Sequence, residues 1–462
     1  MSLSRGFPKH KADLLFTTLI AVLASLKYFY QAFVLNPFEI DQEFLSLEAW
    51  NFLKENKFTL IGAHTSVGGM YVGPFYTYFV TLIMFFTRLH PQTINFLSAL
   101  WAIGTAIALY WVGKRLFSRE VGLIAGILAA ISIKYLSLTD VPPLVIPLAL
   151  ISLLTFYALS QFPAHRKMFL VAVFLSGLAL HLHFTGLYLP LFVIFWLVFT
   201  RTKVTRAELI KALIIMAFFA SPLVIFDLRH NFLNSRNFIT FLLTTNGLKV
   251  IVSSMLRSVH LSLTNLGALF NNLPLNNFWL SLSVWIWFIP YFLLRRRRSP
   301  YHKLLITWLI FPVVANGLYT GELLPYYYIF HHAQIFLVIG LLGQSLILSR
   351  WGCTLLVTLA LLYTLQTLKW HHDHGNAFSL QNKIAAFELI KAHAGDPKSV
   401  NLSFTVEHSR RGGLDFLRRY YGFDPDLRAN RPTYTIVIPH AWQRIKFDYS
   451  FGEIDVVLPP QP

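Results

Sequence analysis

Three carboxylates lie within five residues of one another directly after the first hydrophobic stretch of the chain, at Glu39, Asp41 and Glu43. An amphipathic run follows them, and then the glycine-rich loop Gly62–Tyr78. Holding an acidic group against a bilayer is costly, so acids in such a place indicate function. An ionised carboxylate can accept a proton from a reacting hydroxyl, which makes Asn36–Tyr78 the strongest candidate segment for general-base chemistry.

The composition places the chain among membrane proteins. It is 55% hydrophobic and 16% aromatic, with 13% charged residues and a mean hydropathy of +0.54. A soluble domain carries about 25% charged residues. Apolar stretches close to the ~20 residues that cross a bilayer recur along the first 369 positions. We therefore expect an all-α polytopic membrane protein.

The formal net charge of +18 comes largely from short loops between apolar stretches, most visibly Arg295–Arg298. Such loops stay on the cytoplasmic side, so the charge indicates topology rather than nucleic-acid binding; recognition of anionic lipids is the alternative. Cys353 is the one cysteine and excludes an intrachain disulfide. The sequence has no evident repeat, Walker loop or dinucleotide fingerprint, which argues against an ATP-driven pump.

The charge asymmetry also predicts the topology of an integral plasma (inner) membrane protein. The basic segment Arg5–Lys11 puts the N-terminus in the cytoplasm and makes Leu14–Val34 a permanent signal-anchor span. Basic loops at residues 114–119, 165–167, 201–206 and 295–298 are then inside as well. About eleven crossings are predicted, which leaves the C-terminal tail outside; the last five are Leu209–Phe226, Phe278–Leu294, Leu304–Leu318, Ile329–Leu348 and Thr354–Leu368.

The stretch Gly73–Phe86 conflicts with this count. It lies between the acidic loop and the span Thr93–Val112, whose orientations are already fixed. At roughly 14 residues it is short for a crossing, and we expect a re-entrant or juxtamembrane segment packed against protein. The alternative, a true second crossing, would invert several basic loops.

The chain is expected to divide near residue 370. Residues 1–369 form the predicted membrane domain with its outer catalytic loop at 36–78, and residues 370–462 form a small extracytoplasmic tail. In the tail, Asn382–His393 has helical periodicity, and three segments are typical of short strands: Ser399–Val406, Thr433–Ile438 and Glu453–Leu458. We therefore expect an α/β appendage. The triplet that starts at Asn401 fits a glycosylation sequon, a match that is common by chance.

Most of the notable polar side chains fall on the predicted outer face. They are Glu39, Asp41, Glu43, His64, His181, His183, Asp227, Arg229, His230, Arg236, Glu322, Tyr326–Tyr328, His331 and His332. Lys134 is expected just below them, within an apolar span. A carboxylate from one loop can deprotonate a nucleophile while cations from other loops take up the charge of a departing phosphate. Phosphate leaves readily enough for a base with a pKa of about 4 to suffice.

The segment Ile40–Trp50 resembles the first outer loop of the GT-C glycosyltransferases, and looks closest to the protein O-mannosyltransferase and aminoarabinose-transferase branch of bacteria and archaea. In that family an Asp, usually followed by Glu, precedes aromatic positions and an Ala eight residues on. Asp41 and Ala49 match this pattern. Leu45 stands at an aromatic position, and Gln42 replaces the Glu, so that either Glu43 or Glu39 is expected to take the place of the second acid.

Three further segments resemble the family in the right order, and the resemblance covers roughly residues 10–350. Thr65–Tyr78 is similar to its glycine- and proline-rich loop, Gly177–Thr185 to its small-residue helix that ends in His, and Phe226–Arg236 to its outer segment after the seventh crossing. The resemblance implies inverting transfer of a sugar from a polyprenyl-phosphate donor to a hydroxyl or amine at the outer face. The acceptor would be a glycan, a lipid or a protein.

The resemblance also implies roles for individual residues. Asp41 would be the general base, supported by Glu43 and Glu39. The donor's lipid tail would lie in a groove that faces the membrane lipids, and its phosphate would lie near Arg229, His230, Arg236 and Lys134. The remaining substrate-binding residues would be His64, His183, Tyr326 and Tyr327. No definite cofactor is implied, and a divalent metal is left open.

Each of these residues also has a structural interpretation. Asp41 can serve as a helix N-cap, and the other two acids can be solvated loop charges. The arginines and the tyrosine run can anchor the protein at the membrane interface, and Lys134 can snorkel to the headgroups. His183 can be a hydrogen-bonded interfacial histidine. The tract His371–His374 is either a metal site or a solvated linker.

A transporter or flippase of lipid-linked sugars is the non-catalytic alternative. It would place charged or broken helices near the bilayer midplane, whereas this sequence gathers polar residues at one face. A ligase or polymerase of lipid-linked glycans is a second enzymatic alternative.

Overall fold

The structure is a computed structural model of the 462-residue chain. It describes residues 9–65, 69–132, 134–162, 164–243, 248–269, 279, 281–283, 285–286, 289–290, 300–319, 321–347, 349–373, 377–407, 410–439 and 447–460. The predicted basic loop Arg295–Arg298, much of the predicted span Phe278–Leu294, and His374 lie outside the described residues.

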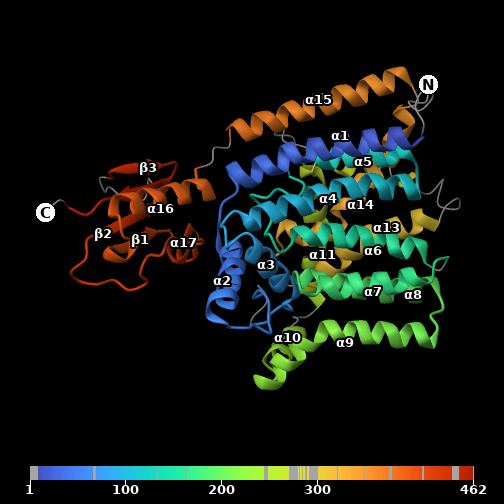
Figure 1. Ribbon diagram of the computed structural model, residues 1–462. Coiled ribbons are helices and arrows are strands. Elements are labelled where there is room, and N and C mark those ends of the chain that lie inside the picture. Colours follow the sequence, from blue (N-terminus) through green and yellow to red (C-terminus); the bar gives the residue numbers. More distant parts are fainter. Residues whose placement is uncertain are drawn as a thin grey trace.

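Long apolar helices run side by side as a bundle (Figure 1). They are α1 (Lys9–Tyr30, extended by a π-helical turn at Gln31–Leu35), α4 (Thr93–Leu116), α5 (Arg119–Ile131), α6 (Ile146–Gln161), α7 (Lys167–Ala179), α8 (Tyr188–Thr200), α9 (Arg206–Arg229), α13 (Pro300–Gly317), α14 (Ile329–Ile347) and α15 (Arg350–Asp373). The predicted all-α membrane architecture is confirmed at this level.

Within the described part of the chain, five helical segments are long and apolar enough to cross a membrane: His10–Leu35, Thr93–Leu116, Arg206–Arg229, Pro325–Gln344 and Arg350–Lys369. Shorter apolar helices accompany them, among them α6, α7 and α8. Their outward faces are apolar, as a lipid surface requires, and the count of eleven crossings stays a prediction.

A buried carboxylate in the bundle is paired with basic groups of neighbouring helices. Asp13 of α1 accepts a hydrogen bond from the Tyr110 hydroxyl (2.7 Å) and from Arg119 Nε (3.1 Å), and it pairs with Lys114. This cluster joins α1, α4 and α5 at the end of the bundle opposite the tail (Figure 1).

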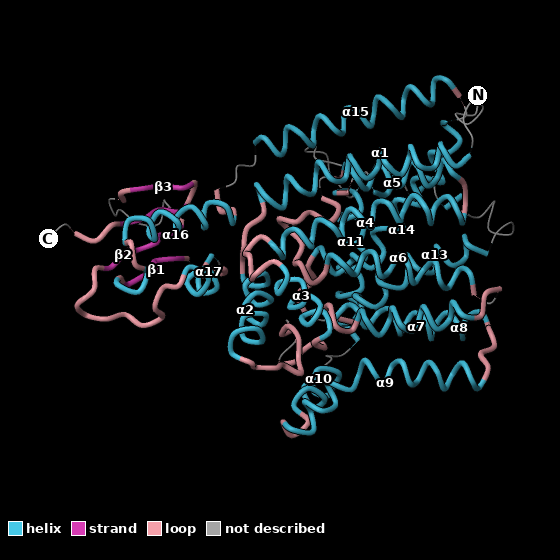
Figure 2. Tube along the Cα trace, in the orientation of Figure 1, coloured by secondary structure: helices cyan, strands magenta, loops and turns pink. Residues whose placement is uncertain are grey.

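Two helices lie across one end of the bundle rather than along it (Figures 1 and 2). These are α2 (Ile40–Glu55) and α3 (Phe75–Phe86), which pack against each other. Twelve residues of α-helix are about 18 Å long, well short of the ~30 Å hydrocarbon core. The dimensions of α3 therefore agree with the juxtamembrane segment expected over Gly73–Phe86.

The predicted spans left residues 227–277 without a helix, and here the structure differs. It has α10 (Leu233–Leu243) and α11 (Leu248–Ala268). α11 packs against α13, with Ser254, Ser258 and Ser262 buried on one face, and Ser258 Oγ donates to the Val313 carbonyl (2.7 Å). Serine, arginine and histidine interrupt its apolar pattern, which is why hydropathy alone misses it.

The tail is the expected small α/β unit. It comprises α16 (Leu380–Ala394), β1 (Asn401–Val406), α17 (Leu414–Tyr421), β2 (Thr433–Ile438), β3 (Tyr449–Phe451) and β4 (Ile454–Val457). The sheet order is β1-β2-β4-β3, with β1 and β2 parallel and the other neighbours antiparallel. The predicted helix and three strands are confirmed, whereas α17 and β3 were not foreseen.

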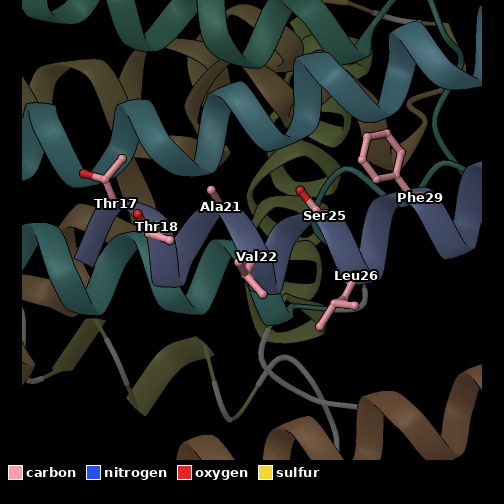
Figure 3. A pocket seen from close by; sticks show the side chains of 7 residues that line it. All are labelled: Thr17, Thr18, Ala21, Val22, Ser25, Leu26 and Phe29. Carbon is pink, nitrogen blue, oxygen red and sulfur yellow. The ribbon is translucent and has the colours of Figure 1, made fainter. Parts of the chain in front are cut away.

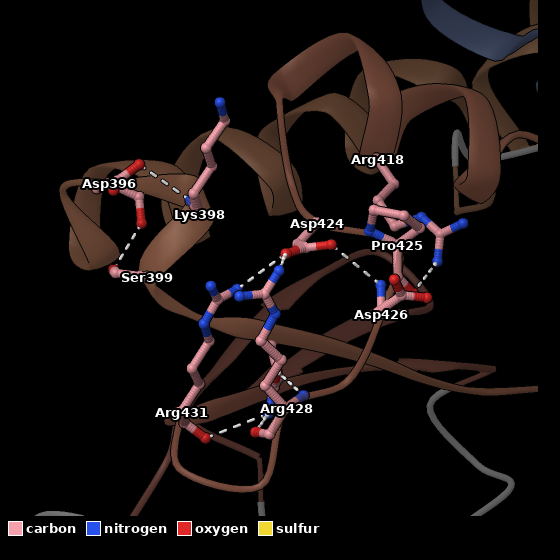
Figure 4. Close-up of polar contacts among 10 residues, drawn as sticks. Asp396, Lys398, Ser399, Arg418, Asp424, Pro425, Asp426, Arg428 and Arg431 are labelled. Atoms are coloured by element: carbon pink, nitrogen blue, oxygen red, sulfur yellow. Dashed lines mark hydrogen bonds and ion pairs between the residues drawn. The ribbon is translucent and has the colours of Figure 1, made fainter.

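Polar contacts shape the loop that precedes β2. Asp424 pairs with Arg428 (3.0 Å) and Arg431 (3.1 Å), as Figure 4 shows. The Asn401 amide donates to the backbone carbonyls of Arg428 (2.8 Å) and Arg431 (3.2 Å). Asn401 is buried and engaged in the fold, so its sequon is not a modification site in the folded protein.

Apolar grooves open on the side of the bundle. One of about 510 Å³ follows α1 and is lined by seven of its residues, from Thr17 to Phe29 (Figure 3). A larger one of about 690 Å³ lies between α15 and the helices α5 and α14, with Leu128, Leu342 and Ala360 among its lining residues.

Candidate functional site

The three clustered acids are separated by the start of α2. Glu39 is the N-cap residue, and it exchanges side-chain and backbone hydrogen bonds with Gln42 in a capping box. Within the helix, Glu43 and Trp50 are seven residues apart and share a face. Asp41 lies two residues from Glu43, about 200° around the helix axis, and therefore faces the other way.

Glu43 is bound to the tail. Its Oε1 accepts hydrogen bonds from the backbone N–H groups of Asp415 (2.9 Å) and Phe416 (3.0 Å), at the start of α17. Carboxylates are favoured at this end of a helix because N–H groups there lack partners. Burial raises the pKa of Glu43, and the bonds from the α17 backbone oppose that rise. The geometry makes Glu43 a helix cap.

Glu39 also faces the tail. Its Oε1 lies 3.4 Å from Lys383 Nζ and 3.9 Å from Arg410 Nη1. Burial raises the pKa of Glu39, and the Lys383 ammonium works against that rise. Two of the three acids proposed for catalysis are thus committed to contacts that hold the tail.

Asp41 differs from both. Its side chain is half-buried, and it forms no hydrogen bond or ion pair with any residue in the described part of the chain. Burial raises the pKa of its carboxyl group. Its charge acts on Tyr326 of the membrane bundle, which places Asp41 on the bundle side of α2. A desolvated carboxylate without a partner is a stronger base than a solvated one.

Facing Asp41 is a cluster of aromatic residues. Tyr326 and Tyr327 belong to the 3₁₀ turn Pro325–Tyr328 that begins α14, and their ring centroids are 5.2 Å apart. The His183 ring lies 5.7 Å from Tyr326 and 5.5 Å from Tyr327. The Tyr319 ring is 6.1 Å from Tyr327. Three of the predicted substrate-binding residues are therefore brought together, and the charge of Asp41 acts on one of them, Tyr326.

His183 has a defined protonation state. Its Nδ1 accepts a hydrogen bond from the Thr185 backbone N–H (3.2 Å), and it lies 2.9 Å from the Thr185 hydroxyl. Burial lowers the pKa of His183 to about 4. The ring is then neutral near pH 7, and the proton is assigned to Nε2, which can donate to a ligand oxygen.

Arg257 on α11 lies next to the segment that carries Tyr319, and it was not among the predicted site residues. Its Nη2 donates to the carbonyl of Gly321 (2.7 Å) and approaches that of Tyr319 (3.4 Å). Its Nε is buried and has no hydrogen-bond partner among the described residues, and no carboxylate there pairs with it. A half-buried guanidinium that has no carboxylate partner is well suited to bind an anionic ligand. The sequence feature that could have identified Arg257 is its place in a largely apolar helix, next to the regularly spaced serines of α11.

Two predicted outer segments do meet. The Tyr71 N–H donates to Asn234 Oδ1 (2.7 Å), and Asn237 Nδ2 donates to the Gly69 carbonyl (2.8 Å). His64 forms an isolated β-bridge with Tyr71, and its exposed ring lies 5.2 Å from the Tyr71 ring. The loop that follows α2 is thus held by α10.

The predicted phosphate-binding cations lie elsewhere on this face. Arg229, His230 and Arg236 are exposed, and no hydrogen bond, ion pair or ring contact in the described structure links them to Asp41. His230 stacks on Phe226, with ring centroids 4.2 Å apart. Asp227 caps α10 by accepting from the Asn234 N–H (2.7 Å). Phosphate binding by these cations stays a prediction, and no contact among the described residues joins them to Asp41.

Lys134 lies in the loop after α5, not inside an apolar span. It forms an ion pair with Asp140 (3.0 Å), and both side chains are largely exposed. His181, by contrast, is buried and accepts from the Phe75 N–H (3.3 Å). Gly73 is required beside it, because a Cβ there would lie 1.9 Å from His181 Nδ1. His181 therefore holds the start of α3.

The described residues contain no cluster of side chains suited to bind a metal ion. Among the described residues, no group of three or more His, Cys, Asp or Glu side chains is placed to hold an ion. The divalent metal left open by the sequence thus has no matching donor set there, and no chemical step is assigned to it.

The chain is similar to known proteins in both sequence and fold. A family model described as dolichyl-phosphate-mannose-protein mannosyltransferase matches residues 71–226. A search of the curated proteins gives no match. Among solved structures, ArnT from Cupriavidus metallidurans bound to undecaprenyl phosphate aligns with a TM-score of 0.60 at 12% identity, covering 98% of this chain and 100% of that one.

Two further structures agree. The apo form of the same ArnT gives a TM-score of 0.59 at 11% identity, with 97% and 100% of the two chains covered. The apo oligosaccharyltransferase of Archaeoglobus fulgidus gives a TM-score of 0.50 at 12% identity, with 87% and 63% covered. The chain shares the fold of these solved structures, and the resemblance that the sequence predicted is confirmed at the level of the fold.

Proposed function

We propose that the protein transfers a sugar from a polyprenyl-phosphate donor to a hydroxyl or amine acceptor at the tail side of the membrane, with Asp41 as general base. The observation that carries the proposal is the contrast among the three acids. Glu39 and Glu43 hold the tail, whereas Asp41 is half-buried, has no partner in the described structure and faces Tyr326. The matched family segment begins after Asp41, so its role rests on this geometry.

The proposed reaction is a single displacement. The acceptor oxygen or nitrogen forms a bond to the anomeric carbon of the sugar as the bond from that carbon to the phosphate oxygen breaks. The acceptor's proton passes to the Asp41 carboxylate, and polyprenyl phosphate leaves with the bonding electron pair. Asp41 later returns the proton to water. One displacement at the anomeric carbon inverts its configuration.

Arg257 and His183 are the groups proposed to receive the charge of the leaving phosphate. The guanidinium has unused donors, and the neutral His183 offers Nε2–H. Charge-assisted hydrogen bonds to phosphate are about twice as strong as neutral ones. The tyrosine rings would bind the sugar, and the donor's prenyl chain would occupy an apolar groove of the bundle.

The orientation is part of the proposal. The cytoplasmic N-terminus and the extracytoplasmic tail are inferred from the basic loops. The start of α1 and the tail lie at opposite ends of the bundle, which supports that assignment (Figure 1).

Proteoliposomes that contain the purified protein and a panel of radiolabelled polyprenyl-phosphate sugars test the function. The transferase predicts acceptor-dependent release of polyprenyl phosphate from one donor. A flippase would move the labelled donor across the bilayer without cleaving it. A ligase or polymerase would consume only donors that carry a glycan on the lipid. Either of the last two results would overturn the proposal.

The pH dependence of transfer should reveal the base. Asp41 acts as the carboxylate, and burial raises its pKa, so kcat/KM should fall as the pH drops through a value above the ordinary Asp pKa of about 3.9. His183, with a pKa of about 4, adds no change between pH 5 and 8. The measurement is kcat/KM from pH 4 to 9, with donor binding followed in parallel. An activity unchanged down to pH 4 would contradict the assignment.

A further inference from the structure

A buried lysine of the tail reaches the backbone directly before Asp41. Lys383 of α16 has a side chain only 1% exposed. Its Nζ donates to the Phe38 carbonyl (2.7 Å) and to the Gly412 carbonyl (2.7 Å), and lies 3.4 Å from Glu39 Oε1. An ammonium group has three hydrogen-bond donors, and burying it costs much free energy unless all three find acceptors. Two of its three acceptors belong to Phe38 and Glu39, the residues directly before α2, which we call the α2 entry, and the third is the Gly412 carbonyl of the tail.

Two glycines allow the tail backbone to touch the backbone of the α2 entry. A Cβ at Gly412 would lie 2.3 Å from the Ile40 nitrogen, and one at Gly413 would lie 2.5 Å from the Phe38 oxygen. Gly413 also has a φ of +90°, which L side chains rarely adopt. A side chain at Gly412 would collide with the backbone of Glu39 and Ile40, next to the carbonyl that Lys383 binds.

The tail makes a second attachment along the same side of α2. Glu43 caps α17, and the Phe416 ring lies 6.4 Å from the Trp50 ring. Arg419 pairs with Glu55 at the end of α2 (2.9 Å). The tail therefore contacts α2 at its first turn, at Trp50 and at its last residue, and the contacts at Glu43 and Trp50 lie on the side opposite Asp41.

We propose that Lys383 is a positioning residue for Asp41, so that the tail is a working part of the catalytic unit and not an appendage. This inference rests on the proposed function, in which Asp41 is the base. A base must lie within hydrogen-bond reach of the proton it takes, and a displacement of about 1 Å costs roughly 100-fold in rate. Lys383 fixes residues two and three positions before Asp41 and thereby sets where its carboxylate stands.

The test is Lys383→Met in the full-length protein, with Lys391→Met as the matched control. Lys391 lies on the same helix but is exposed. For Lys383→Met we expect kcat to fall at least ~10-fold with donor KM within about twofold, because the base moves while the donor site stays. Amide hydrogen exchange of residues 38–47 should quicken. Lys391→Met should change neither quantity.

A double mutant separates positioning from a general structural effect. In an Asp41→Asn background, Lys383→Met should lower the residual rate less than twofold, since the group that it positions is gone. A full additional loss, or an unchanged kcat with unchanged exchange in Lys383→Met, would overturn the inference. If Lys383→Met fails to fold, Gly412→Ala replaces it, because its Cβ displaces the same contact without removing a charge.

Failure of the proposed function gives a different result. If the wild-type protein transfers no sugar from any donor, the transferase proposal falls. The exchange rates of residues 38–47 in Lys383→Met then still decide whether the lysine holds the α2 entry; unchanged rates would overturn that as well.

Discussion

Replacing Asp41 with asparagine is expected to lower kcat for sugar transfer by about 10²–10⁴-fold, the range that general-base catalysis contributes. The amide keeps the size of the carboxylate but cannot take the acceptor's proton. Donor KM should stay within about twofold, since Asp41 acts on the acceptor side. The measurement is steady-state transfer in proteoliposomes with the donor found active for the wild-type protein.

The same substitution should leave the protein at least as stable. Burial raises the pKa of Asp41 in the folded state, so its charged form is disfavoured there and the carboxylate opposes folding above that pKa. Removing the charge therefore should not lower the midpoint of thermal unfolding near pH 7. Glu43→Gln is the matched control, because glutamine can still accept from the α17 backbone; it should retain most activity. Similar losses in both variants would argue against a special role for Asp41.

Replacing Arg257 with glutamine is expected to lower kcat/KM for the donor about 10–100-fold. A hydrogen bond to a charged group contributes about 1.5–3 kcal/mol, which corresponds to that range. The loss should appear in donor KM as weaker phosphate binding, and in kcat as poorer stabilisation of the leaving group. Binding of polyprenyl phosphate itself should weaken in parallel, and titration with this product measures it.

Arg229→Gln is the matched control for Arg257→Gln. Arg229 is exposed and has no contact with Asp41 among the described residues. Its replacement should change donor KM less than threefold. If instead Arg229→Gln weakens donor binding and Arg257→Gln does not, the phosphate lies at α9 and α10, where the sequence analysis placed it.

Sequence patterning could predict most helices because the lipid surface imposes a strong rule. Apolar length alone locates α4, α9 and α14 to within a few residues. Hydropathy did not predict α11, because this helix packs against α13 through serines and also carries Arg257. A helix with a polar face inside a membrane protein has no hydropathy signal of its own.

The candidate site could be predicted in part. The rings of His183, Tyr326 and Tyr327 lie together, and the charge of Asp41 acts on Tyr326, because loops of neighbouring helices meet at one end of the bundle. The roles of these residues stay predictions. Glu39 and Glu43 differ from Asp41 because they contact the tail, which lies more than 300 residues further along the chain. Contacts of such range leave no local pattern, so Lys383 could not be connected with α2 from sequence.

The anomeric configuration of the product tests the central claim most directly. In the proposed reaction one carboxylate, that of Asp41, acts as the base in a single displacement at the anomeric carbon. The donor is synthesised with a defined anomeric configuration, and the transferred sugar is examined by NMR after one turnover. Inversion is the predicted result. Retention would require a nucleophile that forms a glycosyl-enzyme intermediate, and would contradict the role given to Asp41.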